Sequence, residues 1–123
     1  MHGGDIGTPE VLEALEAIAP VIAVRGNNDG ARWADGIPET AVLEAGGARI
    51  FVIHDLAGLS IDPAAQGFAV VVSGHSHKPL VREQDGVLYV NPGSAGPRRF
   101  KLPIGVGYLT VRRGKATAKL LQL

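Results

Sequence analysis

The sequence predicts an α/β or α+β fold in which two mixed β-sheets pack together and helices flank them. Short apolar runs alternate with Gly and Pro, helical spacing is confined to the beginning of the chain, and polar residues directly follow apolar strands. The 123 residues fit one domain, which we place over 1–123. Aromatic residues make up only 5%, so the core is expected to be aliphatic.

One helix is expected near the start of the chain. Thr8 supplies a hydroxyl N-cap and Pro9 suits the first helical position, while Pro20 ends the helix. Between them the apolar residues follow helical spacing at Val11, Leu12, Leu15 and Ile18. The wholly apolar run Val21 to Val24 then predicts a short strand buried on both faces.

The rest of the chain is mostly strand. Gly46-Gly47, Asp85-Gly86 and Arg113-Gly114 are two-residue turns that each predict a hairpin. The paired strands are expected over 40–45 and 49–53, over 81–83 and 87–90, and over 105–111 and 116–121. A further buried strand is expected over 69–72, and residues 62–65 allow a single helical turn at most.

Charge and composition argue against several classes of function and partner. Twelve Lys and Arg balance 12 Asp and Glu, which argues against an extended nucleic-acid partner. The chain has no cysteine, so a transition-metal site must use His, Asp, Glu or Asn. No apolar run approaches the roughly 20 residues that span a bilayer, and no secretory signal is visible. No membrane partner and a cytoplasmic location are therefore expected.

Four polar strings follow apolar segments: Gly4-Asp5, Gly26-Asn27-Asn28-Asp29, Ile53-His54-Asp55 and Gly74-His75-Ser76-His77. Taken singly, the first two are common turn sequences, and His54 could be a half-buried histidine with satisfied hydrogen bonds. Two histidines two residues apart, directly after the strand 70–72, indicate a metal site at least as strongly as a structural pair. Together the strings supply ligands suited to manganese, iron or zinc.

The order of these strings resembles the calcineurin-like metallophosphoesterase superfamily, whose signature is Asp-x-His, Gly-Asp, Gly-Asn-x-Asp, His and Gly-His-x-His. The stretch 91–100, Asn-Pro-Gly-Ser-Ala-Gly-Pro-Arg-Arg-Phe, is similar to the small bacterial phosphodiesterase branch, which is related to a non-catalytic retromer sorting subunit. The resemblance covers essentially the whole chain and implies the metallophosphoesterase sandwich fold.

The resemblance also implies a site for two divalent metal ions, with manganese preferred and zinc, iron or nickel as alternatives. Asp5 would bridge the ions, Asn27, His54 and His75 would complete one site, and His77 would belong to the other. A metal-bound hydroxide would then hydrolyse a small phosphodiester or phosphomonoester. Asn28 and His75 are the expected catalytic residues. Arg98 and Arg99 could hold substrate, although solvated surface charge is the preferred interpretation.

Two departures from the family pattern bear on activity. Asn28 stands where many members have a histidine, and asparagine has no usable proton-transfer pKa. The sequence begins Met1-His2-Gly3-Gly4-Asp5, so the expected N-terminal strand with Asp-x-His is absent from it, and the second metal site is expected to be weak. A misplaced start, a truncation or compensation by a partner subunit would explain this. The absent strand would leave strand edges exposed, which favours pairing with another chain, including a homo-oligomer. The alternative function is a non-catalytic metal-binding or protein-interaction scaffold.

Overall fold

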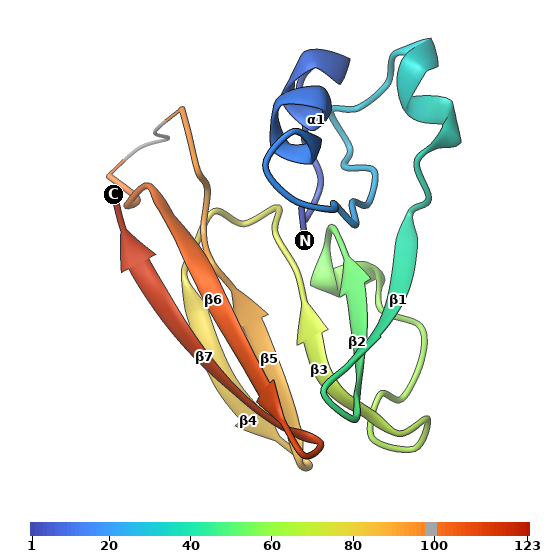
Figure 1. The fold of residues 1–123 in the computed structure, drawn as a ribbon, viewed down its shortest axis with the longest axis vertical. Coiled ribbons are helices and arrows are strands. Elements are labelled where there is room, and N and C mark those ends of the chain that lie inside the picture. The colour runs from blue at the N-terminus through green and yellow to red at the C-terminus, as the bar shows by residue number, and fades with distance from the viewer. Residues whose placement is uncertain (98–100) are drawn as a thin grey trace.

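A computed structural model describes residues 1–97 and 101–123 (Figure 1). The interpretation of Arg98 and Arg99 as surface charge therefore lies outside the described residues. No helix within the described residues is long and apolar enough to cross a membrane. The elements in chain order are α1 (Pro9–Glu16), the 3₁₀ helix η1 (Arg32–Gly36), β1 (Thr40–Ala45), β2 (Ala48–Ile53), the 3₁₀ helix η2 (Leu56–Gly58), β3 (Phe68–Val72), β4 (Leu80–Gln84), β5 (Val87–Asn91), β6 (Gly105–Arg112) and β7 (Lys115–Gln122).

The strands form two sheets, which agrees with the predicted fold class. A five-stranded mixed sheet has the order β1-β2-β3-β5-β4, and β6 and β7 form a separate two-stranded antiparallel sheet. In the larger sheet β2, β3 and β5 run parallel, while β1 and β4 are antiparallel edge strands. The β6–β7 ribbon lies along one side of the molecule in Figure 1.

The three predicted hairpins are confirmed because their signals are local. Each turn contains two consecutive residues with positive φ, which the tight turns between twisted strands require. The φ values are 56° and 80° at Gly46 and Gly47, 53° and 78° at Asp85 and Gly86, and 52° and 78° at Arg113 and Gly114. The observed strand ends differ from the predicted ones by one residue in most cases.

Alternating side chains place an aliphatic core on both faces of the larger sheet. Ile50 and Val52 of β2 point to one face, against which the inner side of the β6–β7 ribbon packs. Phe51 and Ile53 point to the other face, which η2 and the loop after it cover with Leu56, Leu59 and Ile61. The buried residues are mostly Val and Ile, as the low aromatic content predicts.

Two predictions about the beginning of the chain need correction. The expected strand Val21 to Val24 is reduced to one parallel bridge between Ala23 and His2, because within the described residues it pairs only with this short segment. Val24 is nonetheless fully buried. Thr8 occupies the N-cap of α1, but its hydroxyl makes no capping hydrogen bond.

The parallel strands bring three polar segments to the same edge of the sheet. His54 directly follows β2, the 73–77 loop follows β3, and Asn91 is the last residue of β5. Because β2, β3 and β5 are parallel neighbours, their carboxyl ends meet there, which is where open α/β sheets usually place a functional site.

Candidate metal centre

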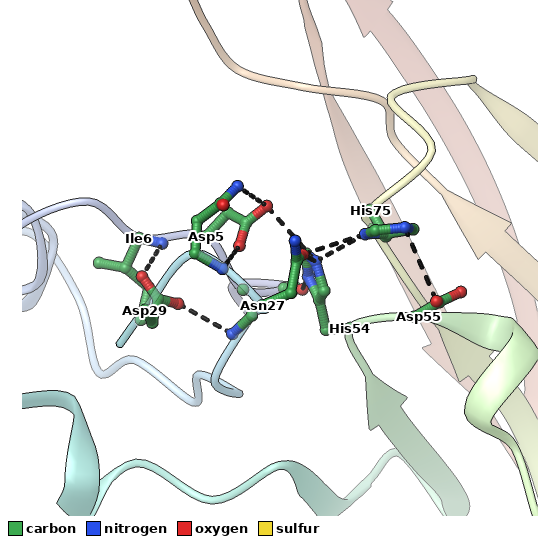
Figure 2. Close-up of polar contacts among 12 residues, drawn as sticks. Asp5, Ile6, Asn27, Asp29, His54, Asp55 and His75 are labelled. Carbon is green, nitrogen blue, oxygen red and sulfur yellow. Dashed lines mark hydrogen bonds and ion pairs between the residues drawn. The ribbon is translucent and has the colours of Figure 1, made fainter. Parts of the chain in front are cut away.

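Two loops from the beginning of the chain are tied together by buried Asp29. Its Oδ1 accepts hydrogen bonds from the amides of Ile6 (2.9 Å) and Gly7 (3.3 Å), and its Oδ2 accepts one from Gly26 (2.9 Å). Asp29 is only 4% exposed. These three bonds hold the loop with Asp5 against the loop with Asn27, as Figure 2 shows.

Asp5 is oriented by the residue that follows Asn27. The backbone amide of Asn28 donates to Oδ1 of Asp5 at 2.9 Å, and the Asn28 side-chain amide donates to Oδ2 at 3.1 Å. A side chain at Gly26 would collide with this carboxylate, which explains why glycine stands there. Asn28, an expected catalytic residue, therefore positions Asp5 in this structure, and its contact with substrate stays a prediction.

His54 sits at the centre of the site and is 6% exposed. Its Nδ1 lies 2.6 Å from the carbonyl oxygen of Gly3, which can only accept, so Nδ1 carries a proton. In a neutral ring the lone pair then belongs to Nε2. Nε2 faces Oδ1 of Asn27 at 2.8 Å and Oδ2 of Asp5 at 3.4 Å.

His75 approaches the same point from the loop after β3. Its Nδ1 lies 3.1 Å from Oδ1 of Asn27 and 3.2 Å from Nε2 of His54. The other ring nitrogen, Nε2, lies 3.7 Å from Oδ2 of Asp55. A carboxylate on that side favours a proton on Nε2, which leaves the Nδ1 lone pair directed at the cluster. Figure 2 shows His54, His75 and Asn27 turned toward one another.

Four electron-donating atoms thus converge: Oδ2 of Asp5, Oδ1 of Asn27, Nε2 of His54 and Nδ1 of His75. Gathered acceptor atoms are unfavourable unless a cation or a proton lies among them. Two imidazole nitrogens with a carboxylate and an amide oxygen suit manganese, iron or zinc. The donor set therefore fits a divalent ion, and Gly3 supplies the carbonyl partner that a metal-bound histidine usually has.

These four atoms lie closer together than the ligands of a bound metal ion do. Tetrahedral ligands with bonds of about 2.1 Å lie about 3.4 Å apart, whereas these atoms are 2.8–3.4 Å apart. When only His, Cys, Asp and Glu side chains are counted, no group of three or more within residues 1–97 and 101–123 is arranged as a metal site. An ion would use the Asn27 amide as well and would separate the donors by a few tenths of an ångström.

His77 is the one predicted ligand that stands apart. Within the described residues, no hydrogen bond or ion pair joins it to the other four, and its Nδ1 is buried without a hydrogen-bond partner. A buried imidazole nitrogen without a partner is uncommon in proteins. This unsatisfied nitrogen fits a second ligand position.

Three of the predicted ligands have left-handed backbones. Asp5, His75 and His77 have φ of 55°, 64° and 60°, a region that costs a non-glycine residue on the order of 1–3 kcal/mol. The other non-glycine residues with positive φ in the described chain, Asp85 and Arg113, lie in hairpin turns. Such strain is common at functional sites, where the surrounding contacts maintain it.

Sequence reasoning missed the residues that support the ligands. Asn91 donates from Nδ2 to the Gly74 carbonyl (2.9 Å) and the Ser76 hydroxyl (3.1 Å), and so holds the loop that carries His75. Asp29 was visible within a string that is common in turns and Asp55 stood beside His54, but neither was expected to support a ligand. Only the folded chain shows that Asp29 bonds to amides of another loop and that Asp55 faces His75, which follows a different strand.

His2 lies near this site and is not among its predicted ligands. Burial lowers the pKa of His2 below its usual range, although the nearby Asp29 carboxylate opposes this effect. The ring is therefore mostly neutral near pH 7. Its Nδ1 accepts a hydrogen bond from the Gly4 amide at 3.2 Å, which helps to shape the turn before Asp5.

Comparison with known proteins identifies the family. The model of the calcineurin-like phosphoesterase superfamily domain matches residues 1–114. The chain belongs to this superfamily. It is 31% identical over 129 residues to a probable metallophosphoesterase of Methanothermobacter thermautotrophicus, which covers 99% of the chain and 74% of that relative. It covers 51% and 64% of two relatives from Methanocaldococcus jannaschii, a probable metallophosphoesterase and a phosphodiesterase, so it spans about half to three quarters of these curated relatives.

Solved structures share the superfamily fold. An archaeal phosphodiesterase aligns with a TM-score of 0.73 and 25% identity, over 96% of this chain and 79% of that one. Vps29 of Entamoeba histolytica, solved in complex with zinc, aligns with a TM-score of 0.73 and 22% identity, over 97% of this chain and 78% of that one. The second likeness concerns the fold alone, and the named relatives support a phosphoesterase superfamily function.

Proposed function

We propose that this protein hydrolyses phosphodiesters or phosphomonoesters with the help of divalent metal ions held by the cluster at the sheet edge. The observation that carries the proposal is the convergence of Asp5, Asn27, His54 and His75 with their lone pairs turned to one point. When bound there, divalent ions would supply positive charge for the phosphoryl group and lower the pKa of a water molecule. Manganese is the preferred metal, with zinc, iron or nickel as alternatives.

The protein's own residues have separate roles in this proposal. His54 and Asn27 would hold one ion together with Asp5 and His75, and His77 would help to hold a second. The exposed Asn28 side chain is close enough to the cluster to donate a hydrogen bond to a phosphate oxygen if it leaves Asp5. Asn28 is no acid, so substrates with good leaving groups are favoured.

A non-catalytic scaffold is the second candidate, because Vps29 structures share the fold. The cluster itself favours hydrolysis over a scaffold without metal, since a purely structural site has no need for four converging acceptor atoms. A scaffold that binds metal without turnover would keep the cluster and lack activity.

Hydrolysis of bis(p-nitrophenyl) phosphate with added manganese separates these candidates. We expect turnover by the unaltered chain, its loss on adding chelator, and its loss in His75→Ala. Lys78→Ala, an exposed change in the same loop, should retain turnover. Equal turnover by His75→Ala would refute the proposed site, whereas metal binding without turnover in the unaltered chain would favour the scaffold.

A further inference from the structure

The charges of this chain are separated along the sequence although they sum to zero. All 12 acidic residues lie within 1–85, whereas seven of the 12 Lys and Arg residues lie within 86–123. The expectation of no extended nucleic-acid partner rests on the net charge of the whole chain. The net charge does not show that acidic and basic residues lie in different parts of the sequence. A local cationic surface on a neutral protein can still attract polyanions.

Four of those seven cations lie on the β6–β7 ribbon: Arg112, Arg113, Lys115 and Lys119. Leu109, Val111, Ala116, Ala118 and Leu120 of the ribbon pack on the core. Because side chains alternate along a strand, the intervening residues form the outer face. That face carries Arg112 opposite Lys115 at the turn and Lys119 opposite Tyr108 farther along.

The outer face also carries hydroxyls and an exposed aromatic ring. Thr110 pairs with Thr117 between the two cationic positions, and Tyr108 is 61% exposed. At the cationic end lies a shallow hollow of about 490 Å³ lined by Thr110, Arg112, Arg113, Lys115 and Thr117. Its lining combines three cations with two hydroxyls and includes no carboxylate, a composition suited to phosphate oxygens.

We propose that the outer face of the β6–β7 ribbon binds single-stranded nucleic acid. Arg112, Lys115 and the two threonine hydroxyls would contact phosphates, and Tyr108 would stack on a base beside Lys119. An exposed aromatic ring among cations on a strand surface is typical of sequence-tolerant single-strand binding. A bilayer fits less well, because threonines rather than apolar residues adjoin Arg112 and Lys115.

Fluorescence anisotropy with a labelled oligothymidylate tests this proposal on the whole chain. Chelator and no added metal keep hydrolysis out of the measurement, so its outcome is independent of the proposed function. We expect binding at low salt. The logarithm of the binding constant should fall against the logarithm of the salt concentration with a slope of about −1.4, as phosphate contacts by two cations, Arg112 and Lys115, on a single strand would give.

Matched variants locate the site. Arg112→Glu should weaken binding by about tenfold or more, while Arg32→Glu, the same charge change at an exposed position in η1, should have little effect. Tyr108→Ala should weaken binding by about fivefold or more, and Tyr108→Phe should retain it. Circular dichroism melting verifies folding, and Arg112→Gln replaces Arg112→Glu if the latter unfolds the ribbon.

Three outcomes would overturn the proposal. The first is no binding at about 50 mM salt, where phosphate contacts are strong. The second is equal weakening by Arg112→Glu and Arg32→Glu, which would reduce the effect to overall charge. The third is binding to anionic phospholipid vesicles without binding to the oligonucleotide, which would assign the ribbon to a membrane surface.

Discussion

The Nε2 atom of His54 lies 2.8 Å from the Oδ1 atom of Asn27, although both atoms are acceptors once Nδ1 of His54 has donated to Gly3. This contact is unfavourable unless a positive charge lies beside it. The two residues are 27 positions apart in sequence and lie in loops that the fold brings together. A cation at this point would account for the whole arrangement, and several predictions about metal binding depend on it.

Metal binding should stabilise the fold through His54. Manganese at about 100 times its dissociation constant should raise the free energy of unfolding by about 2.7 kcal/mol, which thermal melting with and without chelator measures. His54→Ala should lose this gain because Nε2 is the central donor, while Lys78→Ala should keep it. A gain of the same size in His54→Ala would place the metal elsewhere.

The cluster should bind one tight ion per chain. Four donors converge at one point, whereas His77 stands apart from them within the described residues, so a second ion has fewer ligands in place. Isothermal titration calorimetry with manganese should show one strong and one much weaker event. Two equally strong events would mean that His77 and Asp5 form a complete second site.

Asp55 should strengthen metal binding by His75, the predicted ligand that it faces. Asp55→Asn removes the carboxylate 3.7 Å from Nε2 of His75 but keeps an oxygen able to accept from the Ala57 amide. Metal affinity should fall by about 10- to 100-fold, as is usual for such supporting partners. Asp62→Asn, at an exposed loop position, is the control. Unchanged affinity in Asp55→Asn would show that Asp55 does not act on His75.

Asp29 should matter for stability more than its exposed counterparts. Asp29→Asn disturbs three hydrogen bonds to buried or half-buried amides, and we expect a loss of about 1.5–3 kcal/mol in the free energy of unfolding. Urea denaturation measures this loss. Asp62→Asn, whose carboxylate makes one exposed 3.3 Å contact with the Ala65 amide, should cost much less. Equal losses would show that the buried hydrogen bonds of Asp29 contribute no more to stability than the exposed contact of Asp62.

The sequence predicted what depends on nearby residues. The turns at Gly46-Gly47, Asp85-Gly86 and Arg113-Gly114 fix their hairpins locally, so those strands could be placed to within about a residue. Wholly apolar runs predicted strands buried on both faces, and the polar residues after them were expected to carry the site. The convergence of Asp5, Asn27, His54 and His75 was predicted through the family pattern, because no local property of these residues brings them together.

The sequence did not predict what depends on distant partners. Asp29 fits a turn by its composition, and only the folded chain shows that it accepts from Ile6 and Gly7, 22 or 23 positions earlier. The 3₁₀ helix η1 has no strong periodic signal, so no helix was expected over 32–36. The apolar run 21–24 resembles a strand, but forming one requires a neighbour of equal length, and His2 offers a single bridge.

The most direct measurement is a crystal structure of the chain grown with manganese, with anomalous scattering used to locate the metal. We predict a peak bonded to Oδ1 of Asn27, Nε2 of His54 and Nδ1 of His75, with Asp5 completing the shell. The contrary result is no peak at this point together with an Asn27 amide rotated so that its nitrogen donates to both rings. That result would show that hydrogen bonds alone hold the cluster together and that it is not a metal centre.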